Sequence, residues 1–376
     1  MQGHIPMSEL CRQFGVSRKT GYKWTQRFID GGLPNLLNRA TVPHHVPHAV
    51  SADLRGRIID LRVRFPTWGP KKLQAYLQRE HPEESWPARS TMAELLKREG
   101  LVSERKPRRR TPQSSFPLAQ AKAPNDVWCT DFKGKFRIDR RYCHPLTITD
   151  ACSRFLFRCE PLEGERIDAA KAVFEKVFRE YGMPLRMRSD NGTPFASNAV
   201  GGLSRLSIWW IKLGILPERI EVGHPEQNGR HERMHRTLKA EAIKGPDALW
   251  QAQREALETW RNEFNQVRPH EALGMSTPAS KHTPSPRQFP GEAGDPEYPQ
   301  DFDVRRLRPD GALRIGSQEV FVAAVLGGEC IGLEPVDDGL SHAWFGPVYL
   351  GKLRGLGRGK NHFEKHQPVR TTGDVE

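Results

Sequence analysis

Three carboxylates in the middle of the chain stand where predicted elements begin or end. Asp131 lies within a first strand, Asp190 ends a later strand, and Glu232 lies near the start of a helix. Taken singly, an aspartate at a strand end is most often a turn or capping residue. Together the three supply oxygen ligands of the kind that Mg²⁺ prefers, and Mg²⁺ also accepts water and substrate oxygens. They are therefore the candidate catalytic and metal-binding residues of the chain.

The composition narrows the class of protein. The 376 residues carry a formal net charge of +13, and 37% of them are hydrophobic. The length predicts roughly two or three domains, and the apolar content is sufficient for packed cores. No apolar run approaches the roughly 20 residues that cross a bilayer, and residues 1–10 show no secretory signal, so we expect a cytoplasmic protein. The six cysteines form no CxxC pair, which argues against a disulfide framework.

The positive charge is concentrated at the front of the chain. Residues 1–120 hold 21 Lys and Arg against 10 Asp and Glu, whereas the remainder is almost balanced. Such an excess indicates a polyanionic partner, most often nucleic acid, although a solvated basic surface has the same composition. Phosphate contacts in this region would make binding strongly dependent on salt.

Residues 1–45 are predicted to form a helix-turn-helix unit. An apolar-periodic segment ends near Gly15, and Ser17 is placed to cap a second helix. The basic side of that helix would meet phosphates, while Tyr22 and Trp24 are expected to pack inward. Such units normally have three helices and the first is not evident here; an ordinary helical hairpin is the alternative. The predicted DNA contacts are Arg18, Lys19, Lys23 and Arg27.

Residues 51–104 are predicted to form a second helical DNA-binding unit. Its helices are expected over residues 53–65, from Pro70 to residue 80, and from a cap at Ser90 to Gly100. A small dimerisation module would show the same pattern.

A basic, proline-rich linker is predicted over residues 105–124. Its cationic cluster is interpreted as a strap along a DNA backbone, because two helical DNA-binding units precede it; a solvated tether is the alternative. The cluster consists of Arg105, Lys106, Arg108, Arg109 and Arg110.

From residue 125 to residue 282 the periodicity becomes that of an α/β domain. One of its helices, residues 167–181, carries a clear apolar stripe. Strands are expected over residues 127–136, 143–150, 154–159, 185–189 and 219–222. The other helices are expected over residues 200–213, 230–243 and 248–266.

Three further parts are predicted behind the α/β domain. Residues 283–300 are rich in proline and are interpreted as a second linker. Residues 301–354 are predicted to form a small antiparallel barrel, and residues 355–376 a disordered tail. Because residues 301–350 hold 4 basic and 8 acidic residues, a protein contact is expected there rather than a DNA clamp.

The motifs around the three carboxylates resemble those of DDE-class insertion-sequence transposases, the group related to retroviral integrases. The matching stretches are Trp128 with Thr130-Asp131, residues 149–154, Ser189-Asp190-Asn191-Gly192, residues 225–232, Leu238-Lys239 and residues 268–279. The resemblance extends over nearly the whole chain. It implies an α/β fold with a ribonuclease H-like mixed sheet and flanking helices as catalytic core. All-α helix-turn-helix units would precede this core and a small β domain would follow it.

The resemblance also implies a function. The chain would bind the terminal inverted repeats of an insertion sequence and catalyse DNA cleavage and strand transfer, the chemistry of DNA integration and DNA recombination. Its cofactor would be Mg²⁺ or Mn²⁺, with two ions in each active site.

 Two metal ions suit cleavage and joining of a phosphodiester because, about 4 Å apart, they activate the attacking hydroxyl and stabilise the leaving oxygen. Water would first free a 3′-hydroxyl at the element's end, and that hydroxyl would then attack target DNA. The implied partners are double-stranded DNA, at element ends and target, and at least one further copy of the chain.

The third carboxylate must be chosen among neighbours. Glu232 follows Gly229 by three residues, as in the family pattern, and the positions four and seven residues later are basic and share its helix face. Glu226 lies in the preceding turn, and Glu241 falls off that face. The predicted phosphate contacts on the face are Arg236 and Lys239, and the predicted supporting residues are Asn191, Gly192, Asn228 and Gly229.

Two alternatives stay open beside this interpretation. The cluster His44, His45 and His48 is followed by no CxxC pair, which favours a solvated loop over a zinc site. A catalytically inactive or domesticated DNA-binding regulator is the competing function. The intact set of carboxylates argues against a regulator, and the missing first helix argues for it.

Overall fold

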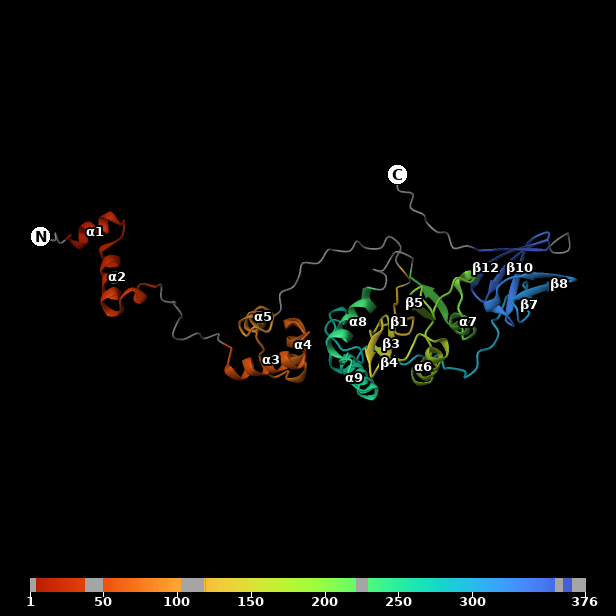
Figure 1. Cartoon of the computed structure of the whole chain (residues 1–376), viewed down its shortest axis with the longest axis horizontal. Coiled ribbons are helices and arrows are strands. Elements are labelled where there is room, and N and C mark those ends of the chain that lie inside the picture. Colours follow the sequence, from red (N-terminus) through yellow and green to blue (C-terminus); the bar gives the residue numbers. More distant parts are fainter. Residues whose placement is uncertain are drawn as a thin grey trace. The chain divides into compact units, whose positions relative to one another are not determined.

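The computed structural model describes residues 5–37, 50–102, 118, 120–220, 229–355 and 361–366. The chain divides into two compact units, Met1–Ala52 and Asp53–Glu376. Figure 1 labels the elements along the chain, and each unit is described by itself below.

The described residues of the first unit form two helices and a short 3-10 helix. Its elements are α1 (Met7–Gln13), α2 (Arg18–Gly31) and η1 (Leu33–Leu36). The predicted cap is confirmed, because Ser17 Oγ accepts a hydrogen bond from the Thr20 amide at 3.2 Å.

The aromatic residues of α2 do not both pack inward. Tyr22 is 60% exposed, so its predicted inward packing is wrong. Trp24 is half-buried, with the Arg27 guanidinium carbon 4.8 Å and Lys23 Nζ 5.8 Å from its ring centroid. Two short helices offer too little surface to enclose both rings, so Trp24 serves as a platform for cations instead.

The second unit begins with three helices around a buried tryptophan. They are α3 (Ala52–Arg64), α4 (Pro70–Glu80) and α5 (Arg89–Arg98). Trp68 is 1% exposed and stacks on Phe65 with 4.0 Å between ring centroids. Pro70 opens α4 as predicted, because a first helical position needs no amide donor. The predicted cap at Ser90 is wrong, since α5 begins after Ala88 without a side-chain cap.

A mixed sheet forms the centre of the second unit. Its strands are β1 (Val127–Phe132), β2 (Phe136–Ile138), β3 (Arg141–Asp150), β4 (Leu156–Leu162), β5 (Arg186–Ser189) and β6 (Leu216–Arg219). The order is β2-β3-β1-β5-β6, with β4 paired to β3. β1 runs antiparallel to β3 and parallel to β5, and β5 runs parallel to β6. The predicted α/β fold with a mixed sheet and flanking helices is confirmed.

Helices cover both faces of this sheet. They are α6 (Ile167–Tyr181), α7 (Arg205–Lys212), α8 (Gly229–Glu241) and α9 (Trp250–Asn262). Figure 1 shows α8 and α9 on one side of the strands and α6 and α7 on the other. β4 packs against helices on both faces of the sheet. Phe157 belongs to the apolar cluster with α6 and α7, whereas Leu156 and Cys159 belong to the apolar cluster with α8 and α9. The site is therefore built on a three-layer core.

Several predicted boundaries shift. The predicted strand 127–136 is two strands, β1 and β2. The predicted helix 200–213 is η2 (Val200–Gly202) followed by α7, because Gly202 has a φ of +66° and Ser204 starts a new helix with a capping box. The predicted strand 219–222 is instead β6, while residues 221 and 222 lie outside the described part. The predicted helix 248–266 is α9 continued by a π-helical turn, Glu263–Val267.

The C-terminal part is antiparallel, but the described strands form two separate sheets rather than the predicted barrel. The five-stranded sheet has the order β13-β12-β11-β10-β7, and β8 pairs with β9. The strands are β7 (Asp303–Arg306), β8 (Ala312–Ile315), β9 (Gln318–Phe321), β10 (Cys330–Asp337), β11 (Leu340–Phe345), β12 (Val348–Arg354) and β13 (His362–Lys365). Ile208 and Ile211 of α7 contribute to its apolar core.

Two segments are more ordered than the sequence suggested. β13 pairs with β12, so the prediction of a disordered tail is wrong for residues 361–366. The proline-rich segment 283–300 is attached to the core by backbone hydrogen bonds. The Ser285 amide donates to the Tyr181 carbonyl, and the Met183 amide donates to the Arg287 carbonyl, both at 2.8 Å. Among the described helices, none is long and apolar enough to cross a membrane.

The side chain of Asn265 joins the π-helical turn to the sheet. Its Oδ1 accepts from the Leu156 amide at 2.8 Å, and its Nδ2 donates to the Leu156 carbonyl at 2.9 Å. Asn265 is 2% exposed. An Asn265→Ala substitution leaves both backbone groups of Leu156 without these partners, so we expect the free energy of unfolding to fall by about 2–4 kcal/mol. Urea denaturation followed by tryptophan fluorescence measures the change.

The neighbouring Gln266 is exposed and provides the control. A Gln266→Ala substitution should change the free energy of unfolding by less than about 0.5 kcal/mol. Equal losses in the two variants would show that the amide bridge of Asn265 contributes nothing of its own.

Candidate active site

Asp131 and Asp190 are brought level by strand register. β1 and β5 are parallel, with Cys129 paired to Arg188. Continuing this register by two residues places Asp131 beside Asp190, and residues two apart on a strand face the same side of the sheet. The register therefore brings the two carboxylates, predicted from separate motifs, to neighbouring backbone positions at the same end of the sheet.

Asp190 stands in a tight turn directly after β5. Its Oδ1 accepts from the Gly192 amide at 3.1 Å, while Asn191 Nδ2 donates to the Ile220 carbonyl at 2.7 Å. A Cβ at Gly192 would lie 3.1 Å from Asp190 Oδ2, so the turn has little room for a side chain. Burial raises the pKa of Asp190, with Glu165 adding to the rise and the Gly192 amide opposing it. A cation at this carboxylate would offset the same burial.

Glu232 lies in the first turn of α8, where a negative side chain interacts favourably with the helix dipole. It is exposed, as are Arg236 and Lys239 on the same face. Met234 and Leu238 are buried on the opposite side. The amphipathic pattern of α8 thus leaves the carboxylate and both basic residues accessible to a ligand.

Two buried histidines attach α8 to the sheet beside Asp131. Nε2 of His231 and of His235 lie 2.7 and 2.8 Å from Thr147 Oγ1. Thr147 is the β3 partner of Asp131 and donates to its carbonyl at 3.0 Å. His235 Nδ1 lies 3.8 Å from Asp131 Oδ2.

These histidines are neutral at physiological pH. Burial lowers the pKa of His231 to about 4 and, with His231 and Lys133 nearby, that of His235 to about 2. Sequence reasoning missed His235 and Thr147. The spacing of four residues between the histidines, which places both on one helix face, was the available signal.

The donor set fits a hard divalent cation, since Asp131, Asp190 and Glu232 offer carboxylate oxygens. Among the described residues, however, no group of three or more His, Cys, Asp or Glu side chains converges on one metal position. The three carboxylates are therefore not gathered into a single ligand set.

Glu241, the other acidic residue of α8 weighed from the sequence, is engaged in packing. It forms an ion pair with Arg268, and their side chains are only 15% and 7% exposed. Trp260 Nε1 also donates to Glu241 Oε2 at 2.7 Å. This pairing favours Glu232 as the ligand, while Glu226 lies outside the described residues.

Besides Arg236 and Lys239 on α8, the predicted DNA contacts form two sets at the front of the chain. Arg18, Lys19 and Lys23 are exposed on α2 and Arg27 is half-buried there, all within the first compact unit. The cluster Arg105, Lys106, Arg108, Arg109 and Arg110 lies outside the described residues, as do Asn228 and the three histidines His44, His45 and His48. Gly229 begins α8.

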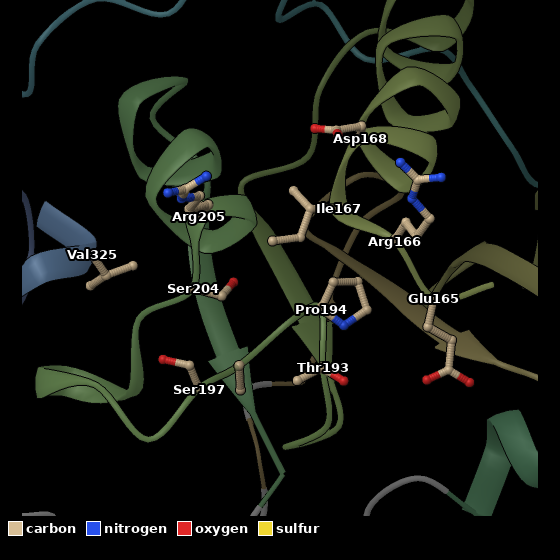
Figure 2. A pocket seen from close by; sticks show the side chains of 11 residues that line it. Glu165, Arg166, Ile167, Asp168, Thr193, Pro194, Ser197, Ser204, Arg205 and Val325 are labelled. Atoms are coloured by element: carbon tan, nitrogen blue, oxygen red, sulfur yellow. The ribbon is translucent and has the colours of Figure 1, made fainter.

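A hollow of about 540 Å³ adjoins the turn after Asp190. Figure 2 shows Thr193 and Pro194 between the starts of α6 and α7, with Val325 and Glu165 on opposite sides. Arg166 and Arg205 line it together with Glu165 and Asp168, so its formal charges balance. The balance gives this hollow no preference for an anion or a cation.

Family models match most of this architecture. Two models described as integrase core domain match residues 121–225 and 213–278, and a homeodomain-like domain matches residues 20–96. The first two cover the sheet, α8 and α9, and the third covers the helical front.

Several insertion-element proteins are similar along most of the chain. A 39.2 kDa protein of insertion element IS476 from Xanthomonas euvesicatoria is 26% identical, over 74% of this chain and 73% of its own length. A 31.7 kDa protein of IS407 from Burkholderia multivorans is 27% identical, over 74% and 92%. Transposase InsD of IS2D from Escherichia coli K12 is 26% identical, over 61% and 78%.

Solved structures of integrases are more distant. The magnesium complex of the HTLV-2 integrase catalytic core is 16% identical with a TM-score of 0.31, over 43% of this chain and 99% of that one. The simian T-cell lymphotropic virus intasome chain is 17% identical with a TM-score of 0.38, over 78% and 97%.

The fold and the family matches together define a protein with an integrase catalytic core. With its insertion-element relatives, the chain is a DDE-type, integrase-like transposase, an enzyme of the polynucleotidyl transferase class that acts in DNA transposition.

We expect substitution of Glu241 and of Glu232, both on α8, to affect the free energy of unfolding differently. Glu241→Gln removes the charge that compensates buried Arg268, so we expect the free energy of unfolding to fall by roughly 3 kcal/mol. Glu232→Gln alters an exposed side chain and should change it by less than about 0.5 kcal/mol. Chemical denaturation of both variants measures the difference. A larger loss for Glu232→Gln than for Glu241→Gln would contradict the structural role assigned to Glu241.

Proposed function

We propose that the chain binds the terminal inverted repeats of its element and cuts and joins DNA strands with Mg²⁺ or Mn²⁺. The observation that carries this proposal is the parallel pairing of β1 with β5, whose register, continued by two residues, sets Asp131 beside Asp190. Glu232 lies on α8, which contacts Thr147 of the adjacent strand β3 through His235. We propose the cytoplasm of a bacterial cell, at its DNA, as the place of action.

The proposed ligands of two metal ions are Asp131, Asp190 and Glu232. When bound, such ions lower the pKa of an attacking hydroxyl and stabilise the leaving oxygen of a phosphodiester. The Gly192 amide orients Asp190, and the contacts of His231 and His235 with Thr147 hold α8 beside Asp131. Arg236 and Lys239 would bind phosphates of the same DNA strand.

Recognition of the element ends is assigned to the front of the chain. The exposed cations of α2, Arg18, Lys19 and Lys23, with half-buried Arg27, would contact the duplex. The basic cluster of residues 105–110 would follow its backbone. Joining two element ends to one target requires at least a dimer, which we propose as the smallest active assembly.

A second candidate function shares one observation with the first. The exposed cations Arg18, Lys19 and Lys23 on α2 would serve a DNA-binding regulator equally well. Such a regulator would bind DNA without cutting it, so cleavage is the property that separates the two functions.

Cleavage is tested with a labelled duplex that carries the end of the element encoding this chain. We expect nicking and joining by the wild-type protein with Mg²⁺ or Mn²⁺, and neither reaction after chelation. Asp190→Asn should lose both reactions, whereas Asp247→Asn, which alters an exposed residue between α8 and α9, should retain them. Binding without cleavage by the wild-type protein would support the regulator.

The individual ligands are tested by Asp131→Ala and Glu232→Gln. Because each removes a proposed metal ligand from the reaction centre, we expect cleavage rates to fall by about 100-fold or more. DNA affinity, measured by fluorescence anisotropy, should remain within about threefold of wild type, which is under 1 kcal/mol. Substantial strand transfer by either variant would show that the ligand assignment is wrong.

A further inference from the structure

A second cavity, of about 490 Å³, is lined by an excess of basic residues. Its walls come from α4, β1, β3, β5, α8 and the segment around residues 264–272. The basic residues that line it are Lys72, Arg154, Arg188, Arg233 and Arg268. The carboxylates that line it are Asp150 and Glu271. Arg188 is paired with Glu218 at 2.7 Å and Arg268 with Glu241, so the positive charge that the cavity presents comes chiefly from the other basic residues, Lys72 among them.

The two carboxylates do not neutralise this charge. Asp150 Oδ1 accepts from the Asn125 amide at 3.0 Å, and its Oδ2 accepts from the amide and hydroxyl of Ser153, both at 2.6 Å. Glu271 Oε2 lies 3.3 Å from Lys71 Nζ, a residue that does not line the cavity. Both acidic groups are thus engaged by groups outside the basic set.

Among the basic residues that line the cavity, Lys72 gives the strongest indication that the cavity binds an anion. Within the described part of the chain, no carboxylate lies within ion-pair distance of its ammonium group. Burial, reinforced by Arg268 and Arg233, lowers the pKa of Lys72 to about 8, although Glu241 and Glu271 oppose the shift. An anion in the cavity would compensate this half-buried charge.

The cavity adjoins the proposed active site. Cys129 and Arg188 line it; Cys129 lies two residues before Asp131 on β1, and Arg188 lies two residues before Asp190, which directly follows β5. At about 3.3 Å of rise per residue, the cavity begins roughly 7 Å from these carboxylates. His231, next to Glu232, lines it as well. A group bound here would be a close neighbour of the reacting one.

The contacts of α4 explain how a lysine from the helical part reaches the core. Arg79 Nη2 donates to the Val267 carbonyl at 3.0 Å, and the Arg268 guanidinium lies 5.7 Å from the Trp68 ring centroid. Val267 also packs against the apolar cluster of the three helices. The second helical part and the catalytic sheet thus contribute to one cavity.

We propose that this cavity binds a backbone phosphate of the DNA on which the active site acts, held jointly by Lys72 of α4 and Arg233 of α8. The inference rests on the proposed function for the identity of the DNA. A phosphodiester supplies one negative charge and acceptor oxygens for both cations. By binding this phosphate, the helices that precede the core would contact the DNA strand next to the proposed catalytic carboxylates.

The test measures affinity of the full chain for a fluorescein-labelled mixed-sequence duplex across a salt series, with chelator present to prevent cleavage. Loss of one phosphate contact should lower the slope of log affinity against log salt by about 1. We expect this change, with roughly tenfold weaker binding, for Lys72→Gln. Lys72→Arg should preserve the slope because the charge remains.

Lys97→Gln is the matched control, because it removes the same charge from an exposed residue of α5 that does not line the cavity. An unchanged slope for Lys72→Gln, or an equal change for Lys97→Gln, would overturn the proposal. Thermal melting checks that the variants are folded; if Lys72→Gln is unfolded, Arg233→Gln, an exposed position on α8, must show the same slope change.

A second arm separates DNA from free phosphate as the occupant. Inorganic phosphate is titrated against wild type and Lys72→Gln, and the melting temperature is followed. Stabilisation lost in Lys72→Gln while the DNA slope stays unchanged would assign the cavity to free phosphate and overturn DNA as its ligand. Because these measurements involve no cleavage, absence of strand cutting would count against the proposed function alone.

Discussion

The contact of two neutral histidines with one threonine positions the whole candidate site. Thr147 lies opposite Asp131 in the sheet, so His231 and His235, by meeting its hydroxyl, fix the start of α8 beside that aspartate. Burial keeps both rings uncharged, which allows close packing near Asp131 without adding a competing positive charge there. The same contact fixes the position of Glu232, because Glu232 lies between the two histidines in the sequence of α8.

Burial has also left charges of both signs incompletely compensated around the same strands. Asp190 has a raised pKa at the end of β5, and Lys72 has a lowered pKa in the neighbouring cavity. Each shift records the cost of removing a charged group from water without a full partner. A cation beside the aspartate and a phosphate beside the lysine would offset both costs, so the two proposed ligands follow from one electrostatic pattern.

The core was predictable where local periodicity determines structure. The helix over 167–181 has the predicted bounds, and the cap at Ser17 was read correctly, because an apolar stripe and a capping hydroxyl are local signals. The break before α7 and the strand β13 were missed. The first depends on glycines with positive φ beside Arg219, and the second on pairing with β12, neither of which local composition reveals.

The sequence by itself determined the chemistry: which carboxylates stand in which motifs, the basic front, and the resemblance that orders them. Only the tertiary structure decided which groups meet. Register set Asp131 beside Asp190, packing turned Glu241 toward Arg268 and left Glu232 exposed, and helix docking placed Lys72 among the arginines. The physical reason is that strand pairing and desolvation depend on segments distant in the chain, whereas sequence patterns report only the preferences of neighbours.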